Sequence, residues 1–492
     1  MIDLGIKKYQ LYCYRQRRIL RKYLKKFETE LDSQKKYNKA LEIMGYALQY
    51  GTGYYTIPAI ENYFLSMAKD IEDVKQDINK IPNSVLHVMT QAYQSGGHSR
   101  VVARWINSAN KDQKHSVVIL QQDKVVIPND IKNAVEAHNG ELYLPQIENL
   151  KERAIYLRNI SYQYQYIVLH IHQNDPTAIL AYGTDNFKTP IILFNHADHS
   201  YWCGSSIVDI VADLRNNDFC KKYRNINKKF LLRIPFELRD NLIHRTKEES
   251  RRRLGIPLDY KVVLTTGSAR KYMPIGDVDF CSVVNEIISK FDKIICYGIG
   301  PTTSIGSWGE RIRYPNFVAL GSIKYGETYF DYVNSCDLYL NSIPIEGGTA
   351  IIDAIQFKKP VVSYAVLKTS LGNIISGVEV ICSKHKLIHL SQKILKSNAF
   401  AKKYAENQYE NVMKYHGIDN WSKNLMNLYL TADSLSHIVH KTNAVKSKID
   451  DQCIMVTSWS KNFSSKKHRK IEARNKVLSF IKNILYKLFD SL

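Results

Sequence analysis

The chain has 492 residues, of which 45% are hydrophobic and 24% charged, and it carries a formal net charge of +22. This composition excludes a disordered or fibrous protein, and the length predicts two or three domains. The eight cysteines are scattered without metal-like spacing, and no apolar stretch approaches the ~18 residues that a membrane-spanning helix needs. With no apolar segment of the kind found in secretion signals near its start, we expect a cytoplasmic protein with free thiols.

Most of the positive charge lies at the two ends of the chain. Residues 1–40 hold twelve Lys or Arg against four Asp or Glu, and residues 460–492 hold nine against two. A nucleic-acid-binding protein would more often spread basic residues over its folded body, so we expect no nucleic-acid partner. Basic ends favour an anionic membrane surface as a partner, which would place the protein peripherally on the inner face of the membrane. Solvated basic tails are an equally good interpretation.

The pattern of apolar residues divides the chain into regions. Residues 1–80 predict a basic helical region, because apolar residues recur at three- and four-residue spacing. Over residues 81–240, and again over 241–435, short apolar runs alternate with helical stretches, which is typical of parallel sheets covered on both faces. We therefore predict an α/β fold of two Rossmann-like doubly wound lobes, with a polar linker over residues 224–257.

Residues 436–492 predict a basic tail. Its last segment, RNKVLSFIKNILYKLFDSL, places apolar side chains on one helical face with lysines at the flanks of that face. This pattern is typical of an amphipathic helix at a membrane interface. A helix packed onto the body of the protein is the alternative.

A glycine pair precedes a predicted helix in the second lobe, in the segment NSIPIEGGTAIIDAIQ. Gly347 and Gly348 clear side chains from the helix start, where unpaired N–H groups favour a phosphate. Thr349 can donate its hydroxyl, and Asp353 lies one turn further on the same face, where a carboxylate could accept hydrogen bonds from a ribose. An ordinary tight strand-to-helix turn is the alternative.

Two cations follow the first predicted strand of the second lobe, in the segment LTTGSARKYMP. Gly267 and two other small residues precede Arg270 and Lys271. A guanidinium and an ammonium at the carboxyl end of a strand are suited to a diphosphate. Two solvated loop cations are the alternative.

A second glycine pair ends the first strand of the first lobe, in the segment QSGGHSRVV. Gly97 keeps this loop tight and places His98 at the edge of the predicted cleft. Histidine has a suitable intrinsic pKa for a general base near neutrality. A histidine that only caps the helix is the alternative.

A polar cluster follows a later strand of the first lobe, in FNHADHSYWCG. His196 and His199 have no third ligand nearby, so a metal site is disfavoured. Aromatic rings beside polar groups suit sugar faces, and we therefore assign His196, Asp198 and Trp202 to acceptor binding. His199 is the second candidate for a general base.

Together these motifs resemble a GT-B-fold glycosyltransferase. EGGTAIIDAIQFKKPVVS is similar to an element of the O-GlcNAc-transferase-like family and its bacterial adhesin-glycosylating relatives. The resemblance implies that Lys271 pairs with the diphosphate of the donor, that the Gly347–Thr349 turn holds its phosphates and that Asp353 holds its ribose. His98 resembles the first-lobe histidine near the reaction centre of that family. Retaining GT-B families with two glutamates seven residues apart would match at Glu346 only.

The resemblance implies transfer from a nucleotide-diphosphate sugar, with a UDP-sugar favoured, to a saccharide, a lipid-linked saccharide or a protein. No D-x-D element ends a predicted strand convincingly, so we expect no metal and no cofactor. Whether the reaction retains or inverts the sugar's configuration stays open. A sugar-nucleotide epimerase, a polyol-phosphate transferase and a catalytically silent binding subunit are the alternatives.

Overall fold

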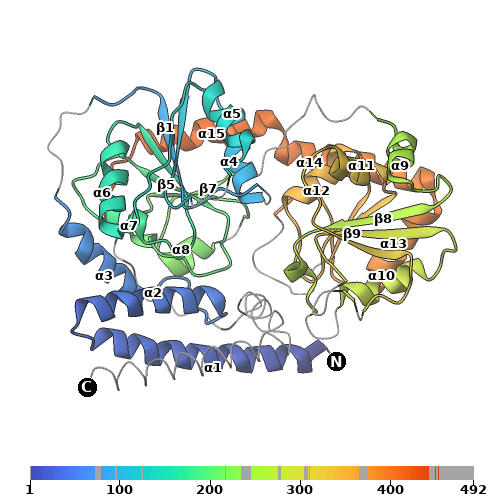
Figure 1. The fold of residues 1–492 in the computed structure, drawn as a ribbon, viewed down its shortest axis with the longest axis horizontal. Helices are drawn as coiled ribbons and strands as arrows, with labels where there is room; N and C mark the ends of the chain where they lie inside the picture. Colours follow the sequence, from blue (N-terminus) through green and yellow to red (C-terminus); the bar gives the residue numbers. More distant parts are fainter. Residues whose placement is uncertain are drawn as a thin grey trace, which may run out of the picture.

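In the computed structural model, the described residues are 2–440 together with 442, 449 and 453, apart from residues 73–78, 95–96, 123–125, 217, 234–244, 275–278, 304–307, 310 and 365–373. They form two α/β lobes side by side, with three helices packed along one end of the first lobe (Figure 1). The tail predicted over residues 436–492 lies almost entirely outside the described residues.

The first lobe is built on a parallel sheet of seven described strands in the order β3-β2-β1-β4-β5-β6-β7. Alternate residues along each strand pack against helices on the two faces, as the sequence pattern predicts. The strands are β1 (Ser84–Met89), β2 (Lys114–Ile119), β3 (Leu142–Tyr143), β4 (Tyr166–His170), β5 (Ile191–Asn195), β6 (Ile210–Asp213) and β7 (Lys229–Leu231), and the helices are α4 (Gly97–Asn107), α5 (Asn129–Ala137), α6 (Leu150–Ser161), α7 (Thr177–Tyr182) and α8 (Phe219–Arg224).

The second lobe repeats this topology. Its six described strands are parallel in the order β10-β9-β8-β11-β12-β13, which matches the first six of the other sheet. The strands are β8 (Lys261–Thr266), β9 (Ile294–Ile299), β10 (Phe317–Gly321), β11 (Leu338–Leu340), β12 (Val361–Tyr364) and β13 (Val380–Ile381), and the helices are α9 (Lys247–Leu254), α10 (Phe280–Ile288), α11 (Glu327–Ser335), α12 (Thr349–Gln356), α13 (Lys384–Lys396) and α14 (Asn398–His416). In both sheets the strand order reverses beside the first strand, which is where ligands bind in open α/β sheets.

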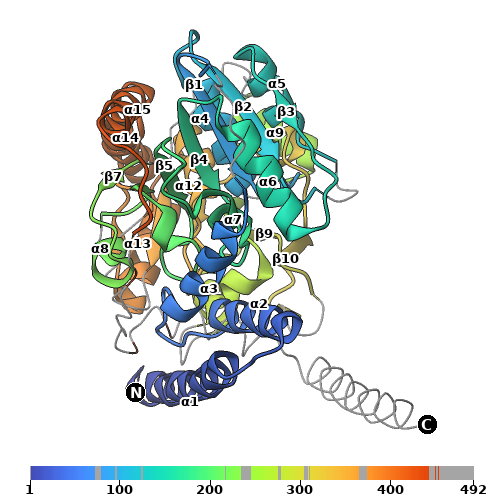
Figure 2. The ribbon, with the colours of Figure 1, turned by 90° about the vertical axis from the view of Figure 1, so that its left-hand side faces the viewer.

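The N-terminal region is helical, as the sequence predicts. α1 (Ile2–Glu28), α2 (Ser33–Gln49) and α3 (Pro58–Lys69) precede the first sheet, and α2 and α3 pack on the first lobe (Figures 1 and 2). Buried Glu61 of α3 accepts hydrogen bonds from the backbone N–H groups of Gly204 and Ser206, which ties this region to the loop after β5. The helices therefore belong to the folded body.

The last described helix, α15 (Ile418–Asp433), differs from the sequence prediction. The prediction placed residues up to 435 in the second lobe, whereas α15 crosses to the first lobe and packs beside α4 and β4 (Figure 1). Trp421 meets Trp105 of α4 edge to face at 5.5 Å, and the Trp105 indole donates to the Tyr429 hydroxyl at 3.0 Å. A single apolar cluster thus continues from one lobe to the other.

The predicted linker is also more ordered than expected. Its described residues include β7 and α9, and α9 begins with a reciprocal capping box between Thr246 and Glu249. Arg251 and Arg253 pair with Asp337 and Asp331 of the second lobe. The polar composition of this segment suggested a linker. Its polar residues instead cap helix α9 and form ion pairs with the second lobe.

Candidate functional site

The two glycine motifs meet where the lobes face each other. A Cβ atom added to Gly97, at the start of α4, would lie 3.2 Å from Thr349 Oγ1, at the start of α12. Gly348 is the N-cap of α12 and gives its first turn no side-chain cap. α4 follows β1 and α12 follows β11, so both turns lie at the reversal points of their sheets. The structure therefore brings the predicted phosphate turn to the interlobe contact.

Asp353 of α12 is fully buried at this contact. Its carboxylate accepts hydrogen bonds from the Tyr325 and Tyr329 hydroxyls, each at 3.1 Å. Arg100 of α4 reaches across the lobes, with Nη1 3.5 Å from Asp353 Oδ2 and Nη2 donating to Thr349 Oγ1 at 3.2 Å. The Arg104 Nη2 atom lies 3.7 Å from Asp353 Oδ1. Ribose binding by Asp353 stays a prediction, and it would require these partners to give way.

Lys271 follows β8 in a short 3₁₀ turn, η2 (Ala269–Tyr272), and its side chain is partly buried. Its Nζ donates to the backbone carbonyl of Glu346 at 3.0 Å, directly before the glycine pair. Burial lowers the pKa of Lys271 to about 8, an effect that Glu346 opposes and Arg215 reinforces. The amine therefore lies beside the predicted phosphate turn, in a partly buried position.

The other cation-loop residues differ in what the structure describes. A Cβ on Gly267 would lie 3.3 Å from the Tyr272 hydroxyl and 3.4 Å from the Lys271 Cδ, so this glycine allows the turn to pack closely. Arg270 lies in η2, but its side chain lies outside the described part of the chain. Donor binding by both residues stays a prediction.

An ion-pair bridge joins the lobes beside Lys271. Arg215, which follows β6, donates from Nη1 to Asp198 Oδ1 at 2.7 Å, and its Nη2 lies 3.5 Å from Glu346 Oε1. Burial alone would raise the pKa of Asp198, but Arg215 and His199 hold it below its usual range. Burial raises the pKa of Glu346 despite Arg215 and Lys271 nearby. Asp198 is thus the ion-pair partner of Arg215. Its predicted contact with an acceptor would have to be made while it is paired in this way.

Imidazole rings gather on the first-lobe side of the contact. The rings of His98 and His196 lie 4.4 Å apart, and His172 lies 6.4 Å from His98. Burial, reinforced by His196 and His172, lowers the pKa of His98 well below its ordinary value. His98 Nε2 is buried and makes no hydrogen bond to the described residues. A neutral ring with a free nitrogen can accept a proton, as a general base must.

The remaining acceptor residues line a small cavity of about 20 Å³, with His172, His196 and Trp202 in its wall. The Arg224 guanidinium lies 4.5 Å from the Trp202 ring centroid and covers one face of that ring. His199 Nδ1 lies 3.4 Å from Asp198 Oδ1, on the same side. This part of the first lobe is therefore tightly packed, and a sugar would need more room than the cavity of about 20 Å³ leaves.

Sequence reasoning missed the residues that cross between the lobes. Arg100 lies one helical turn after Gly97, and Arg215 follows directly after a buried strand. The rule that selected Lys271, that ligands bind beyond the carboxyl ends of strands, would have selected Arg215 as well. His172 follows β4, and the same rule would have selected it too. No signal in the sequence pairs Arg100 with Asp353.

No group of three or more His, Cys, Asp or Glu side chains in the described ranges is placed to hold a metal ion. The expectation of a metal-independent reaction stays a prediction. Among the helices that the structure describes, none is long and apolar enough to cross a membrane.

Comparison with known proteins bears on the fold and not on the geometry of this site. No protein-family model matches the chain. TuaC of Bacillus subtilis (strain 168), assigned to teichuronic acid biosynthesis as a glycosyltransferase, is 25% identical over 249 residues, which make up 50% of this chain and 56% of TuaC. The chain therefore matches only a little over half the length of this relative.

Solved structures extend the likeness to most of the chain. A point mutant of an O-GlcNAc transferase from Thermobaculum terrenum has a TM-score of 0.53 at 12% identity and covers 88% of this chain and 83% of its own. A glycosyltransferase of Rickettsia africae has a TM-score of 0.53 at 13% identity, covering 72% and 99%. HepE of Anabaena in complex with UDP and glucose has a TM-score of 0.51 at 12% identity, covering 71% and 99%.

These structures define the class of fold. The chain has the two-lobed GT-B fold of these glycosyltransferases, and the fold predicted from its sequence is confirmed. At such low identity the likeness concerns the fold alone, so activity has to be argued from the chain's own residues.

Proposed function

We propose that this protein is a glycosyltransferase that moves a sugar from a nucleoside-diphosphate donor, a UDP-sugar, to a saccharide or lipid-linked saccharide of a bacterial surface glycan. The glycan class is taken from the assignment of TuaC, and the donor class from HepE, which is described in complex with UDP and glucose. The observation that carries the proposal is the partly buried Lys271 amine, which donates to the Glu346 carbonyl beside the glycine turn that opens α12.

In this proposal the second lobe binds the donor. The diphosphate lies against the N–H groups at the start of α12, where the helix dipole favours an anion, and the Lys271 ammonium neutralises it. Thr349 donates its hydroxyl and Asp353 accepts from the ribose once Arg100 has moved away. Lys271 and the helix amides take the place of a metal ion, because they stabilise the same growing negative charge.

The first lobe supplies the acceptor side. The acceptor hydroxyl oxygen attacks the anomeric carbon of the donor sugar while the bond from that carbon to the β-phosphate oxygen breaks. The nucleoside diphosphate leaves with the electron pair, and the hydroxyl proton passes to neutral His98. His98 is chosen over His199 because its Nε2 is buried and makes no hydrogen bond within the described part of the chain.

The proposal places the acceptor at an anionic membrane face. α1 exposes Leu11 and Tyr14 to solvent at 70% and 52%, beside exposed Arg15, Arg18 and Lys22. Each cation near an anionic surface adds about 1 kcal/mol of attraction. The variant Arg15→Glu/Arg18→Glu/Lys22→Glu should float less with phosphatidylserine vesicles than the unchanged protein, and neither should float with neutral vesicles. Equal flotation on the anionic vesicles would remove α1 from this role.

Donor binding is the decisive test. Calorimetry with UDP-glucose and UDP-N-acetylglucosamine should detect binding of at least one donor, and Lys271→Ala should weaken it roughly 10-fold to 100-fold, as expected for loss of a charge-assisted hydrogen bond to the diphosphate. Lys290→Ala, an exposed lysine after α10, is the matched control and should bind normally.

Two outcomes would contradict the proposal. Binding of neither nucleotide sugar would reject the donor class, and equal binding by Lys271→Ala and the unchanged protein would reject the donor site. Chromatography of the products separates the alternatives, because an epimerase returns an altered nucleotide sugar without any acceptor.

A further inference from the structure

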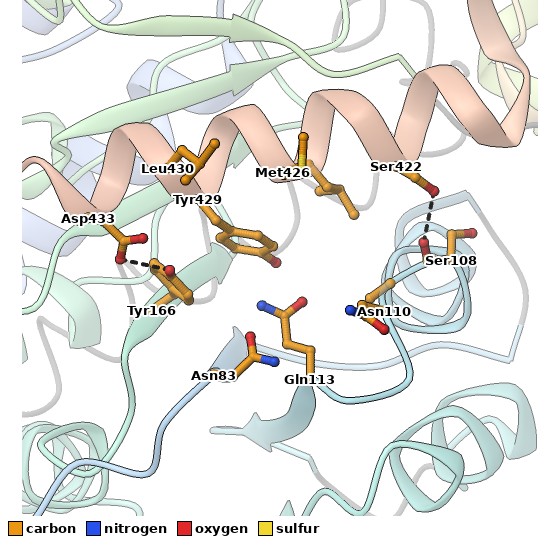
Figure 3. A pocket seen from close by; sticks show the side chains of 12 residues that line it. Asn83, Ser108, Asn110, Gln113, Tyr166, Ser422, Met426, Tyr429, Leu430 and Asp433 are labelled. Carbon is orange, nitrogen blue, oxygen red and sulfur yellow. Dashed lines mark hydrogen bonds between the residues drawn. The ribbon is translucent and has the colours of Figure 1, made fainter.

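A second cavity lies at the opposite end of the first sheet from the interlobe contact. It has a volume of about 410 Å³ and is enclosed between α15 and the amino ends of β1, β2 and β4 (Figure 3). β1 has six residues at ~3.3 Å each, so roughly 20 Å separates this cavity from the reaction centre. Its lining residues are Asn83, Ser108, Ala109, Asn110, Gln113, Tyr166, Ser422, Leu425, Met426, Tyr429, Leu430 and Asp433.

Side-chain amides form one wall of this cavity. Asn83, Asn110 and Gln113 point into it from the loops of the first lobe (Figure 3). Asn83 Nδ2 donates to the Asp112 carbonyl at 3.1 Å, and Gln113 Oε1 lies 2.9 Å from His115 Nε2. These bonds fix the two amides and leave Asn83 Oδ1 and Gln113 Nε2 without a partner among the described residues. The wall therefore presents a fixed acceptor and a fixed donor to the cavity.

The facing wall is apolar and comes from α15. Met426 and Leu430 are 58% and 59% exposed, and Tyr429 extends between them toward the amides (Figure 3). Asp433 closes one end, where its Oδ1 accepts from the Tyr166 hydroxyl at 2.7 Å. A ligand here would therefore have one apolar face and one face that forms hydrogen bonds.

The charges of the lining residues limit which class of ligand can bind in this cavity. Among the residues that the structure describes, the lining contains one carboxylate and neither lysine nor arginine. A phosphate, a nucleotide or an acidic sugar would meet Asp433 without a compensating cation, which is unfavourable in a partly enclosed site. An anionic ligand is therefore disfavoured, and a neutral ligand meets no such penalty.

We propose that this cavity is a second saccharide site, which holds a neutral stretch of glycan away from the reaction centre. A sugar ring has a C–H face that suits Met426 and Leu430 and hydroxyl groups that suit the amides. The volume lies within the ~300–1,000 Å³ typical of small-molecule sites. The identity of the ligand rests on the proposed function, because an enzyme that extends glycans gains from a second grip on its acceptor, which raises the local concentration of chain ends.

Ligand-observed saturation-transfer NMR tests this proposal on the full chain. The probes are maltotriose, cellotriose and chitotriose, which are neutral and differ in linkage and substituents. At least one should receive saturation from the protein. Met426→Trp and, independently, Leu430→Trp should reduce that signal at least tenfold, because each indole fills the cavity from an exposed helix position.

Asn427→Trp is the matched control, since Asn427 is exposed on the same helix but does not line the cavity. It should leave the signal unchanged. Binding of UDP-glucose, measured on the same samples, reports on the donor site and on folding, so failure of one site is told apart from failure of the other. Saturation of none of the three probes, or an equal signal in Met426→Trp and Asn427→Trp, would overturn the proposal.

Discussion

The two lobes share one strand order, but they bring different groups to the contact between them. At the carboxyl end of the first sheet, His98, His172 and His196 gather in partly or fully buried positions, and burial lowers the pKa of each ring. At the corresponding end of the second sheet stand Lys271 and the open first turn of α12. One lobe therefore offers neutral proton acceptors and the other offers positive charge, although their topology is the same.

The difference extends into the sheets themselves. In the first sheet, fully buried His115, His87 and His170 form a hydrogen-bonded row across β2, β1 and β4, with N–N distances of 2.9 and 3.0 Å. Burial lowers the pKa of all three rings well below the ordinary value. The centre of the second sheet is filled mainly by apolar residues such as Val263 and Leu338. Burial of imidazole thus recurs in the first lobe and favours the neutral form of these buried rings.

Replacing His98 is expected to have the largest effect and to separate the roles of the lobes. His98→Gln should lower kcat roughly 100-fold to 10,000-fold, the usual contribution of a general base, while donor affinity stays the same. His385→Gln, an exposed histidine on α13, is the control. Steady-state kinetics of sugar transfer measure kcat, and calorimetry measures the affinity for the donor. A loss of donor affinity in His98→Gln, with kcat preserved, would assign His98 to donor binding. It would contradict the division of roles between the two lobes.

The pH dependence of donor affinity and of kcat tests the same division of roles between the lobes, with a smaller expected effect. The Lys271 pKa is lowered to about 8, so its ammonium form predominates below that pH and is lost as the pH rises through it. Donor affinity should then fall about tenfold for each pH unit above roughly 8, if only the ammonium form binds. The His98 pKa lies below its ordinary value of 6.5, so kcat should not fall as the pH decreases from about 7.5 to 6.5.

Lys271→Arg isolates the alkaline limb, because arginine keeps its charge over this range. Donor binding by Lys271→Arg should therefore change little between about pH 7 and pH 10, even if it is weaker at every pH. An alkaline loss of affinity that survives in this variant would have to come from another group.

The sequence predicted the parts of the fold that depend on local pattern. Short apolar runs located β1, β2, β4, β5 and β8 to β12, because a strand buried on both faces has to be apolar along its length, whereas β3, β6 and β7 were not predicted. The glycine pairs at the starts of α4 and α12 located the interlobe contact. Both helices start at the reversal point of a sheet, where ligands bind in open α/β sheets and side chains have to leave room. Lys271 was found by its place after β8.

What the sequence did not predict depends on distant partners. Arg100 looks like any cation on an amphipathic helix, and only the folded chain brings it to Asp353, 253 positions away. The return of α15 to the first lobe was missed because its apolar face would suit either sheet. Its partners Trp105 and Tyr166 could be identified only after the lobes were placed side by side.

That return of α15 restricts how the two lobes can move. Up to residue 440, the main chain passes between them twice, once between β7 and α9 and once between α14 and α15. The second passage is tight, since a Cβ on Gly417 would lie 2.7 Å from the Met413 carbonyl oxygen. Two bodies tied at two points can swing about the axis through both ties, but sliding or twisting would strain one of them. A swing about that axis is therefore the movement by which Gly97 and Thr349 would separate with least strain.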